Sequence, residues 1–373
     1  MTDPAAGEFC ATVNLVHTLK ETPMPYKVIQ YATGITGSLT LKTLSERRDM
    51  KLVGLGCTSH AKVGKDAGEI TGGALTGIKA TNDISALCAL DADVVLHMPL
   101  PSALMGSGPR TDQDVICEFL ASGKNVITTV GYIYPKAYGP EVVARLEAAC
   151  AKGKSSLHGT GYNPGFVSDV IPATLLSMSA RVDRVFIQDI SEFATHPSWS
   201  FVHDYLGMGM SPETFENRTA YKAYSDSLFA ESVYMLADCL GAAIDEIKPS
   251  LEYCVATEDL QLTSGVIRKG TVSAFCGRWQ AVVGGKSLID IWLIYRTRGD
   301  QGLQWGGTSK PFVFQIDGRP RFRVELDHDW ISSGLWGTAG HAINAIPHVV
   351  AATPGIRTFL DLPMIRARGA VRL

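Results

Sequence analysis

The chain has 373 residues, of which 46% are hydrophobic and 19% are charged, a composition typical of a globular protein with two or three domains. The formal net charge of -3 excludes a general electrostatic attraction to nucleic acid, and no apolar stretch is long enough to span a membrane. The eight cysteines form no CxxC pair, which argues against a zinc site and is typical of reduced thiols in a cytoplasmic protein.

Residues 1–23 show neither a regular pattern nor a secretory signal, and we expect an N-terminal extension there. From residue 26 to residue 159 the chain alternates short apolar runs with helical patterns. The expected strands cover residues 26–32, 51–57, 93–98, 125–130 and 155–159, and the expected helices cover residues 38–48, 113–122 and 141–152. This alternation predicts a doubly wound parallel sheet of the Rossmann type.

The first expected strand runs directly into a glycine-rich turn and a helix. Residues 32–37 (ATGITG) follow the GxGxxG pattern, with Ala32 in the first glycine position. In this pattern the middle glycine lets the backbone approach a pyrophosphate, and the last glycine lets the helix pack closely on the strand. The predicted cofactor-binding residues of this turn are Thr33, Gly34, Ile35, Thr36 and Gly37. The alternative is an ordinary strand–helix turn.

The end of the second strand indicates which dinucleotide is bound. An NAD-selective site usually has an acidic residue there, which binds the ribose diol. This chain has Thr58, Ser59 and Lys62 instead. Two hydroxyls and an ammonium suit a 2′-phosphate, so we predict NADP, with NAD as the alternative.

Further cofactor and substrate contacts are expected from the loops that follow the later strands, since these loops meet at the carboxyl edge of the sheet. His97, Met98 and Pro99 lie at the end of one expected strand and are predicted to border the cofactor. Asn163, before Pro164 and Gly165, has the pattern of a helix cap. We expect Asn163 to hold the nicotinamide amide or a substrate oxygen at that helix start, and a plain helix cap is the alternative.

The second half of the chain has a different pattern. Residues 184–193 alternate like a half-exposed strand, and residues 212–240 are largely helical. Further strands are expected at residues 271–283, 287–298, 311–316 and 321–326, followed by a helix at residues 338–352. These elements predict an α+β domain on an open mixed or antiparallel sheet. Asp327 and Asp329 could share one face of a strand, but they have no evident third ligand, so we predict no metal site.

Four segments together resemble a known family: YATGITGS at residues 31–38, KVGKDAGE at 62–69, GTGYNPGF at 159–166 and the ending TAGHAINAIPHVVAATPGIRTFLDLP at 338–363. They are similar to the 2,4-diaminopentanoate dehydrogenase and native amine dehydrogenase family, whose members are often labelled as having a dihydrodipicolinate reductase N-terminal domain. The resemblance implies a Rossmann domain of residues 24–163 and 338–373, a substrate and dimerisation domain of residues 164–337, and a homodimer. It also implies NAD(P)-dependent interconversion of a small amine with a ketone or aldehyde plus ammonia.

One departure from the family bears on the chemistry. Family members resemble each other in a carboxylate just after the strand equivalent to residues 125–130, whereas this chain has Val130-Gly131-Tyr132-Ile133-Tyr134. The candidates for the acid–base or positioning group are Tyr132, Tyr134, Asn163, His158 and Glu192. For each of the tyrosines, for His158 and for Glu192, a structural role is the competing interpretation.

The sequence thus favours an oxidoreductase of the amine dehydrogenase type. One alternative is an NADP-dependent carbonyl or alcohol oxidoreductase on the same scaffold, which would explain the missing carboxylate. The other is a non-catalytic NADP-binding protein. Ammonia dependence distinguishes the first two, and turnover across a panel of amines, ketones and alcohols distinguishes both from the third.

Overall fold

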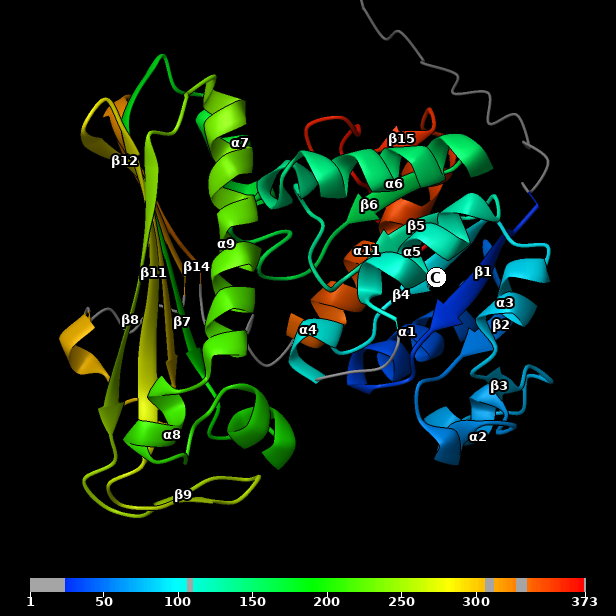
Figure 1. Ribbon diagram of the computed structural model, residues 1–373, viewed down its shortest axis with the longest axis horizontal. Helices are drawn as coiled ribbons and strands as arrows, with labels where there is room; N and C mark the ends of the chain where they lie inside the picture. Colours follow the sequence, from blue (N-terminus) through cyan, green and yellow to red (C-terminus); the bar gives the residue numbers. More distant parts are fainter. Residues whose placement is uncertain (1–23, 106–109, 306–311, 327–333, 372–373) are drawn as a thin grey trace, which may run out of the picture.

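The computed structural model describes residues 24–105, 110–305, 312–326 and 334–371. The expected extension at residues 1–23 and the Asp327 to Asp329 run lie outside these ranges. The chain forms two large sheets that stand side by side with helices between and around them (Figure 1). Among the described helices, none combines the length and the apolar character needed to cross a membrane.

The first sheet is parallel throughout and has the strand order β15-β6-β5-β4-β1-β2-β3. Its strands are β1 (Tyr26–Tyr31), β2 (Met50–Gly56), β3 (Ala80–Thr81), β4 (Val94–His97), β5 (Asn125–Thr128), β6 (Ser156–Gly159) and β15 (Gly355–Ile356). This is the order of a doubly wound dinucleotide-binding sheet, so the predicted Rossmann architecture is confirmed. The strand register brings the ends of β1, β4, β5 and β6 to one edge.

Helices cover both faces of the first sheet, which explains why its strands are almost continuously apolar. The helices of this half are α1 (Ile35–Ser45), α2 (Ala67–Thr71), α3 (Ile84–Ala89), α4 (Ser102–Met105), α5 (Asp112–Ala121), α6 (Pro140–Gly153) and α11 (Gly334–Val350). One face packs against α3, α5 and α6. The other packs against α1 and α11, so a helix from the end of the chain completes the first domain.

The second sheet is mixed and has the order β14-β13-β7-β12-β11-β8. Its strands are β7 (Arg181–Glu192), β8 (Glu246–Val255), β11 (Val272–Val283), β12 (Lys286–Arg296), β13 (Phe312–Arg319) and β14 (Phe322–Leu326). Only β7 and β12 pair in parallel, and the other pairs are antiparallel. Three short helices, α7 (Val170–Leu176), α8 (Pro212–Glu216) and the π-helical turn Phe201–Tyr205, and the small pair β9 (Leu260–Gln261) with β10 (Val266–Ile267), complete this half.

Helix α9 (Thr219–Leu240) joins the two halves of the molecule, as Figure 1 shows. On one side, Phe229 and Val233 pack into the core of the second sheet. On another side, Met235 packs against Ile133 and Tyr134 of the first domain. The second half of the helix is therefore buried on two sides, and its residues that point toward the first domain belong to the domain interface.

Candidate cofactor and substrate site

The glycine loop lies between β1 and α1, as predicted. Gly34 caps α1 without a side-chain hydrogen bond, so the first N–H groups of the helix have no capping side chain. A Cβ placed on Gly34 meets no atom within 4 Å, whereas a Cβ on Gly37 lies 2.2 Å from the carbonyl oxygen of Ala32. The two glycines thus have different tasks: Gly34 leaves room for a ligand, and Gly37 permits the packing of the helix on the strand. Space and free donors at a helix N-terminus fit a pyrophosphate.

Ala32 takes the first glycine position in a conformation that glycine favours, with a φ of 74°. The side-chain amide of the buried Gln30 donates to the Ala32 carbonyl at 2.9 Å and helps to fix this turn. The pattern in the sequence identified the turn, but not the side chain that supports it.

The residues after β2 lie beside the glycine loop. Thr58 and Ser59 are exposed, and the Lys62 ammonium donates to the Thr33 carbonyl oxygen at 2.5 Å. The positive charge of Lys62 is therefore held at the loop, next to the side on which the adenosine ribose binds in this fold.

The three predicted residues at the end of β4 differ in their exposure to solvent. His97 is fully buried, stacks on Tyr31 with ring centroids 5.3 Å apart, and has a ring nitrogen 3.0 Å from the Thr128 hydroxyl. Burial lowers the pKa of His97 to about 3, so the ring is neutral. Met98 is also buried, and Pro99 is the partly exposed member of the predicted trio.

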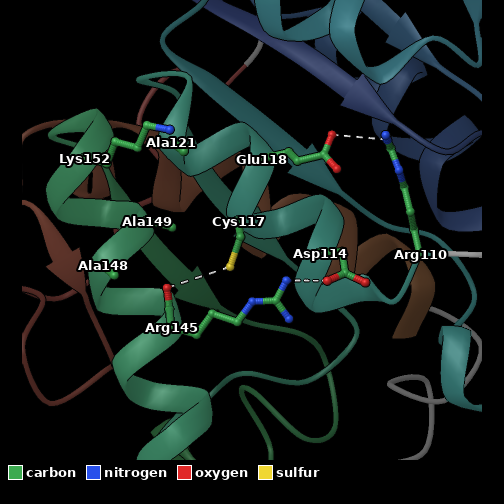
Figure 2. A pocket seen from close by; sticks show the side chains of 9 residues that line it. All are labelled: Arg110, Asp114, Cys117, Glu118, Ala121, Arg145, Ala148, Ala149 and Lys152. Atoms are coloured by element: carbon green, nitrogen blue, oxygen red, sulfur yellow. Dashed lines mark hydrogen bonds and ion pairs between the residues drawn. The ribbon is translucent and has the colours of Figure 1, made fainter.

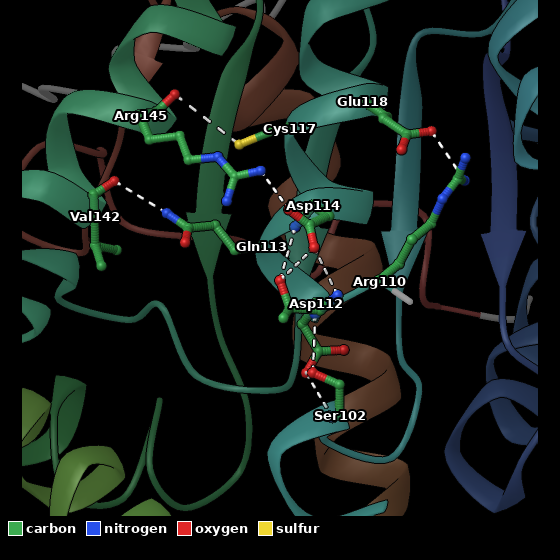
Figure 3. A network of polar contacts seen from close by, with 10 residues as sticks. Ser102, Arg110, Asp112, Gln113, Asp114, Cys117, Glu118, Val142 and Arg145 are labelled. Carbon is green, nitrogen blue, oxygen red and sulfur yellow. Dashed lines mark hydrogen bonds and ion pairs between the residues drawn. The ribbon is translucent and has the colours of Figure 1, made fainter. Parts of the chain in front are cut away.

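Ser102, at the start of α4, is bonded to the start of α5, as Figure 3 shows. The Asp112 carboxylate accepts hydrogen bonds from the backbone N–H of Ser102 at 2.7 Å and from its hydroxyl at 2.8 Å. Thr111 and Asp114 form a capping box, and Asp114 also pairs with Arg145 of α6. These bonds hold the start of α4 against the start of α5, and the start of α5 against α6.

The loop after β5 carries the two candidate tyrosines. Both rings are packed against other parts of the protein, and the pKa of each phenol is raised. The Tyr132 ring packs against the core between the first sheet and α5 and α6, and burial raises its pKa. Tyr134 is buried and donates its hydroxyl to Asp238 of α9 at 2.5 Å. Burial also raises the pKa of Tyr134, with the Asp238 hydrogen bond adding to the rise. The placement of both rings favours their structural interpretation.

A carboxylate that the sequence analysis missed contacts this loop. Glu231 of α9 is fully buried and accepts hydrogen bonds from the backbone N–H groups of Tyr132, at 3.0 Å, and Tyr134, at 2.7 Å. It also accepts the hydroxyl of Tyr138 at 2.6 Å. The sequence shows a glutamate inside a long, largely apolar helix, which is the one signal that could have identified it. Its role depends on which loop of the first sheet the helix packs against, and the sequence does not give that contact.

The loop after β6 corrects one expectation. Asn163 does not cap a helix: α7 begins at Val170, and Gly165 has a φ of 126°, which is incompatible with a helix start at Pro164. The Asn163 side chain instead donates to Asp189 at 2.6 Å and accepts from the Ser168 hydroxyl at 2.6 Å. The Asn163 amide is thus held in one orientation, but no helix dipole supports it.

Asp189 is a second carboxyl that the sequence analysis missed. It lies on β7, two residues beyond Ile187, on the face that packs toward α9. Besides Asn163, it accepts the Ser191 hydroxyl at 2.7 Å. It is 2% exposed, and burial raises its pKa to about 7. The Asn163–Asp189 bond therefore joins the second sheet to a loop of the first domain.

The two remaining candidates lie away from this bond. His158 is fully buried, has a ring nitrogen 2.7 Å from the Arg357 carbonyl oxygen, and packs against Phe359. Burial lowers its pKa to about 4, which favours its structural interpretation. Glu192 pairs with Arg296 at 3.8 Å. Because side chains alternate along a strand, Glu192 points to the opposite face from Asp189, which favours its structural interpretation.

Three buried carboxyls lead to a prediction on pH and stability. Burial raises the pKa of Glu231 to about 8, of Asp189 to about 7 and of Asp169 to about 6. Since ordinary values are about 4, folding favours the protonated forms, and their stabilising contribution is lost as the pH rises through these folded values. Burial keeps His97 and His158 neutral, so their contribution to stability rises with pH instead. This rise ends at about pH 6.5, the ordinary pKa of histidine, and does not affect the range above it.

We therefore expect the midpoint temperature of thermal unfolding to fall between pH 6.5 and pH 8.5, and Asp189→Asn to reduce that fall. Thermal melts of both proteins across this range test the prediction. A midpoint that rises with pH in the wild type would contradict it.

A surface hollow lies between α5 and α6, and Figure 2 shows the residues that line it. The ion pair from Arg145 to Asp114 crosses it from α6 to α5, whereas Arg110 pairs with Glu118 on the α5 side. None of the predicted cofactor residues lines it, so it is separate from the glycine loop. Across the described part of the chain, no three His, Cys, Asp or Glu side chains are grouped so as to hold a metal ion.

Comparison with known proteins places this geometry in a family. A family model for the 2,4-diaminopentanoate dehydrogenase C-terminal domain matches residues 166–371. An amine dehydrogenase of Streptomyces virginiae is 26% identical over 360 residues, which cover 91% of this chain and 97% of that protein. A 2,4-diaminopentanoate dehydrogenase of Acetoanaerobium sticklandii is 26% identical over 247 residues, which cover 65% and 67% of the two chains.

Solved structures agree on the fold. An amine dehydrogenase from Mycobacterium smegmatis has a TM-score of 0.77 at 19% identity, with 92% of this chain and 98% of that chain covered. A myo-inositol dehydrogenase from Lactobacillus casei, solved with NAD(H) and myo-inositol, has a TM-score of 0.54 at 13% identity, with coverages of 90% and 89%. Since the family model spans more than half of the sequence, the chain belongs to the family defined by the 2,4-diaminopentanoate dehydrogenase C-terminal domain.

Proposed function

We propose that the protein is an NAD(P)-dependent amine dehydrogenase, which interconverts a small amine and a ketone or aldehyde plus ammonia. The observation that carries the proposal is the uncapped, open glycine loop at Gly34 in a chain of this family. The similarity to the Streptomyces virginiae amine dehydrogenase extends over nearly the whole of both chains and supports the same activity.

NADP is the proposed cofactor. The nicotinamide, when bound, accepts or gives the hydride. The chain's own contribution is to hold the pyrophosphate at the N-terminus of α1 and to place the Lys62 charge beside the glycine loop, at a strand end where Thr58 and Ser59 are exposed. The resemblance further supports a homodimer, and the scattered cysteines without a CxxC pair support a cytoplasmic location.

Asn163 remains the proposed residue on the substrate side. It follows β6, at the edge of the sheet where the loops meet, and Asp189 and Ser168 fix the orientation of its amide. Its remaining N–H can donate to a substrate oxygen or to the nicotinamide amide. An amide held in this way orients a bound molecule with little loss of side-chain freedom.

An ammonia-dependence assay tests the function. We expect NADPH oxidation with a panel of small ketones and aldehydes to require ammonium, and to be faster with NADPH than with NADH. Turnover that is equal without ammonium would favour the carbonyl or alcohol oxidoreductase, and tight NADPH binding without any turnover would favour a binding protein. A strong preference for NADH would contradict the interpretation of Lys62.

A further inference from the structure

The loop after β5 has a backbone that needs external support. Gly131 has a φ of 100° and Tyr132 has a φ of 60°, so two successive residues adopt left-handed conformations. Such a conformation costs free energy at Tyr132, because a non-glycine side chain rarely adopts it. The loop keeps this shape only where surrounding contacts stabilise it.

Glu231 provides that support from the other domain. Its Oε1 accepts from the Tyr132 N–H and the Tyr138 hydroxyl, and its Oε2 accepts from the Tyr134 N–H. All three donors belong to the loop between β5 and α6, whereas Glu231 lies about 100 residues later, on α9. Because Glu231 is fully buried, no water competes for these three hydrogen bonds, and they define the geometry of the loop closely.

The absence of a side chain at Gly131 leaves the space that the carboxyl of Glu231 occupies. A Cβ on Gly131 would lie 2.8 Å from the Tyr138 hydroxyl oxygen and 3.0 Å from Glu231 Oε1. Residue 131 therefore has no room for a side chain while the carboxyl of Glu231 stays in place. The group that shapes this loop comes from α9 and not from the loop itself.

We propose that Glu231 is a positioning residue for the reaction, because it fixes the loop after β5 at the edge where cofactor and substrate meet. The inference rests on the proposed function. Since α9 also packs on the second sheet, the carboxyl couples the position of the loop to the domain that is expected to bind the substrate. NADP(H) affinity depends on the glycine loop, so Glu231 should affect turnover far more than cofactor binding.

Glu231→Gln is the decisive variant. A glutamine has one acceptor oxygen, so in either orientation its NH₂ faces at least one backbone or phenol donor of the loop. We expect kcat/KM for the amine to fall roughly 10- to 100-fold, because small displacements at a reacting centre have effects of this size. The dissociation constant of NADPH should stay within about twofold. Hydrogen exchange in a peptide covering residues 130–138 should accelerate roughly tenfold or more.

Asp226→Asn is the matched control. Asp226 lies on the same helix, but it accepts the Trp279 indole N–H at 3.0 Å on the side of the second sheet. Its loss should lower stability slightly and leave exchange in residues 130–138 unchanged. If Glu231→Gln does not fold, Tyr138→Phe removes one donor to the carboxyl and keeps the ring; it should accelerate the same exchange by a smaller factor and lower kcat/KM.

The outcomes separate this inference from the proposed function. Unchanged exchange in residues 130–138 in the variants overturns the inference, whatever the activity is. Faster exchange with unchanged kcat/KM also overturns it, because the role would then be structural only. A wild-type protein without amine turnover overturns the proposed function and with it the catalytic part of the inference, even if the exchange result shows that Glu231 holds the loop.

Discussion

Gly34→Asp is expected to fold like the wild-type protein and to bind NADPH at least about 100-fold more weakly, a loss of about 2.8 kcal/mol. A Cβ on residue 34 meets no atom within 4 Å, and the φ of Gly34 is -69°, which any residue adopts. The added carboxylate would stand where the pyrophosphate approaches the N-terminus of α1, so like charges repel and the free N–H groups are shielded. Fluorescence titration with NADPH and a thermal melt measure the two properties separately.

Gly73→Asp serves as the control for the added charge. Gly73 follows α2, and a Cβ there has only one neighbour, the Thr71 hydroxyl at 3.5 Å, an ordinary contact. This variant should keep NADPH affinity within about twofold. Should Gly34→Asp bind NADPH as tightly as the wild type, the cofactor loop has been assigned to the wrong turn.

Gly159→Ala is expected to lower the free energy of unfolding by about 3 kcal/mol or more, which is large for the addition of one methyl group. A Cβ on Gly159 would lie 2.1 Å from the carbonyl oxygen of Tyr132 and 2.4 Å from the nitrogen of Ile133. These are backbone atoms of the loop that Glu231 holds, so they cannot move aside without breaking its hydrogen bonds. Urea unfolding measures the change.

Gly34→Ala provides the comparison for this variant, because it adds the same methyl group in open space. Its free energy of unfolding should stay within about 0.5 kcal/mol of the wild-type value. Equal stability of Gly159→Ala and Gly34→Ala would show that the loop after β5 does not lie against β6 as described.

Most of the fold could be predicted from the sequence, because its strands, turns and helices follow from patterns of neighbouring residues. The first strand, the glycine turn and the helix after it were predicted within a few residues, as were β11 and β12, which were expected at residues 271–283 and 287–298. Strand β8 was missed, since it contains Pro249 and several exposed polar residues that break the apolar alternation. It pairs with β11 on one side only, at the edge of the sheet, where such residues are tolerated.

The site was accessible only in part, because its polar contacts are made between segments far apart in the chain. The glycine loop is local and was predicted. The bonds of Glu231 to residues about 100 positions earlier, and of Asp189 to Asn163, depend on how the domains pack. The helix-start pattern at Asn163 was misleading, because the side chain that matched the cap is engaged by a strand of the other domain instead.

The return of the chain to the first sheet has a consequence for synthesis on the ribosome. Ile343 and Ile346 of α11 cover the face of the first sheet that contains Val28 and Leu96, and β15 adds its last strand. At 5–20 residues per second, the roughly 200 residues that separate β6 from β15 take on the order of ten seconds or more to make. Throughout that time the part of this apolar face that α11 covers in the folded protein is exposed in the nascent chain. A version that stops before α11 should therefore bind chaperones or aggregate, even though it contains the entire glycine loop.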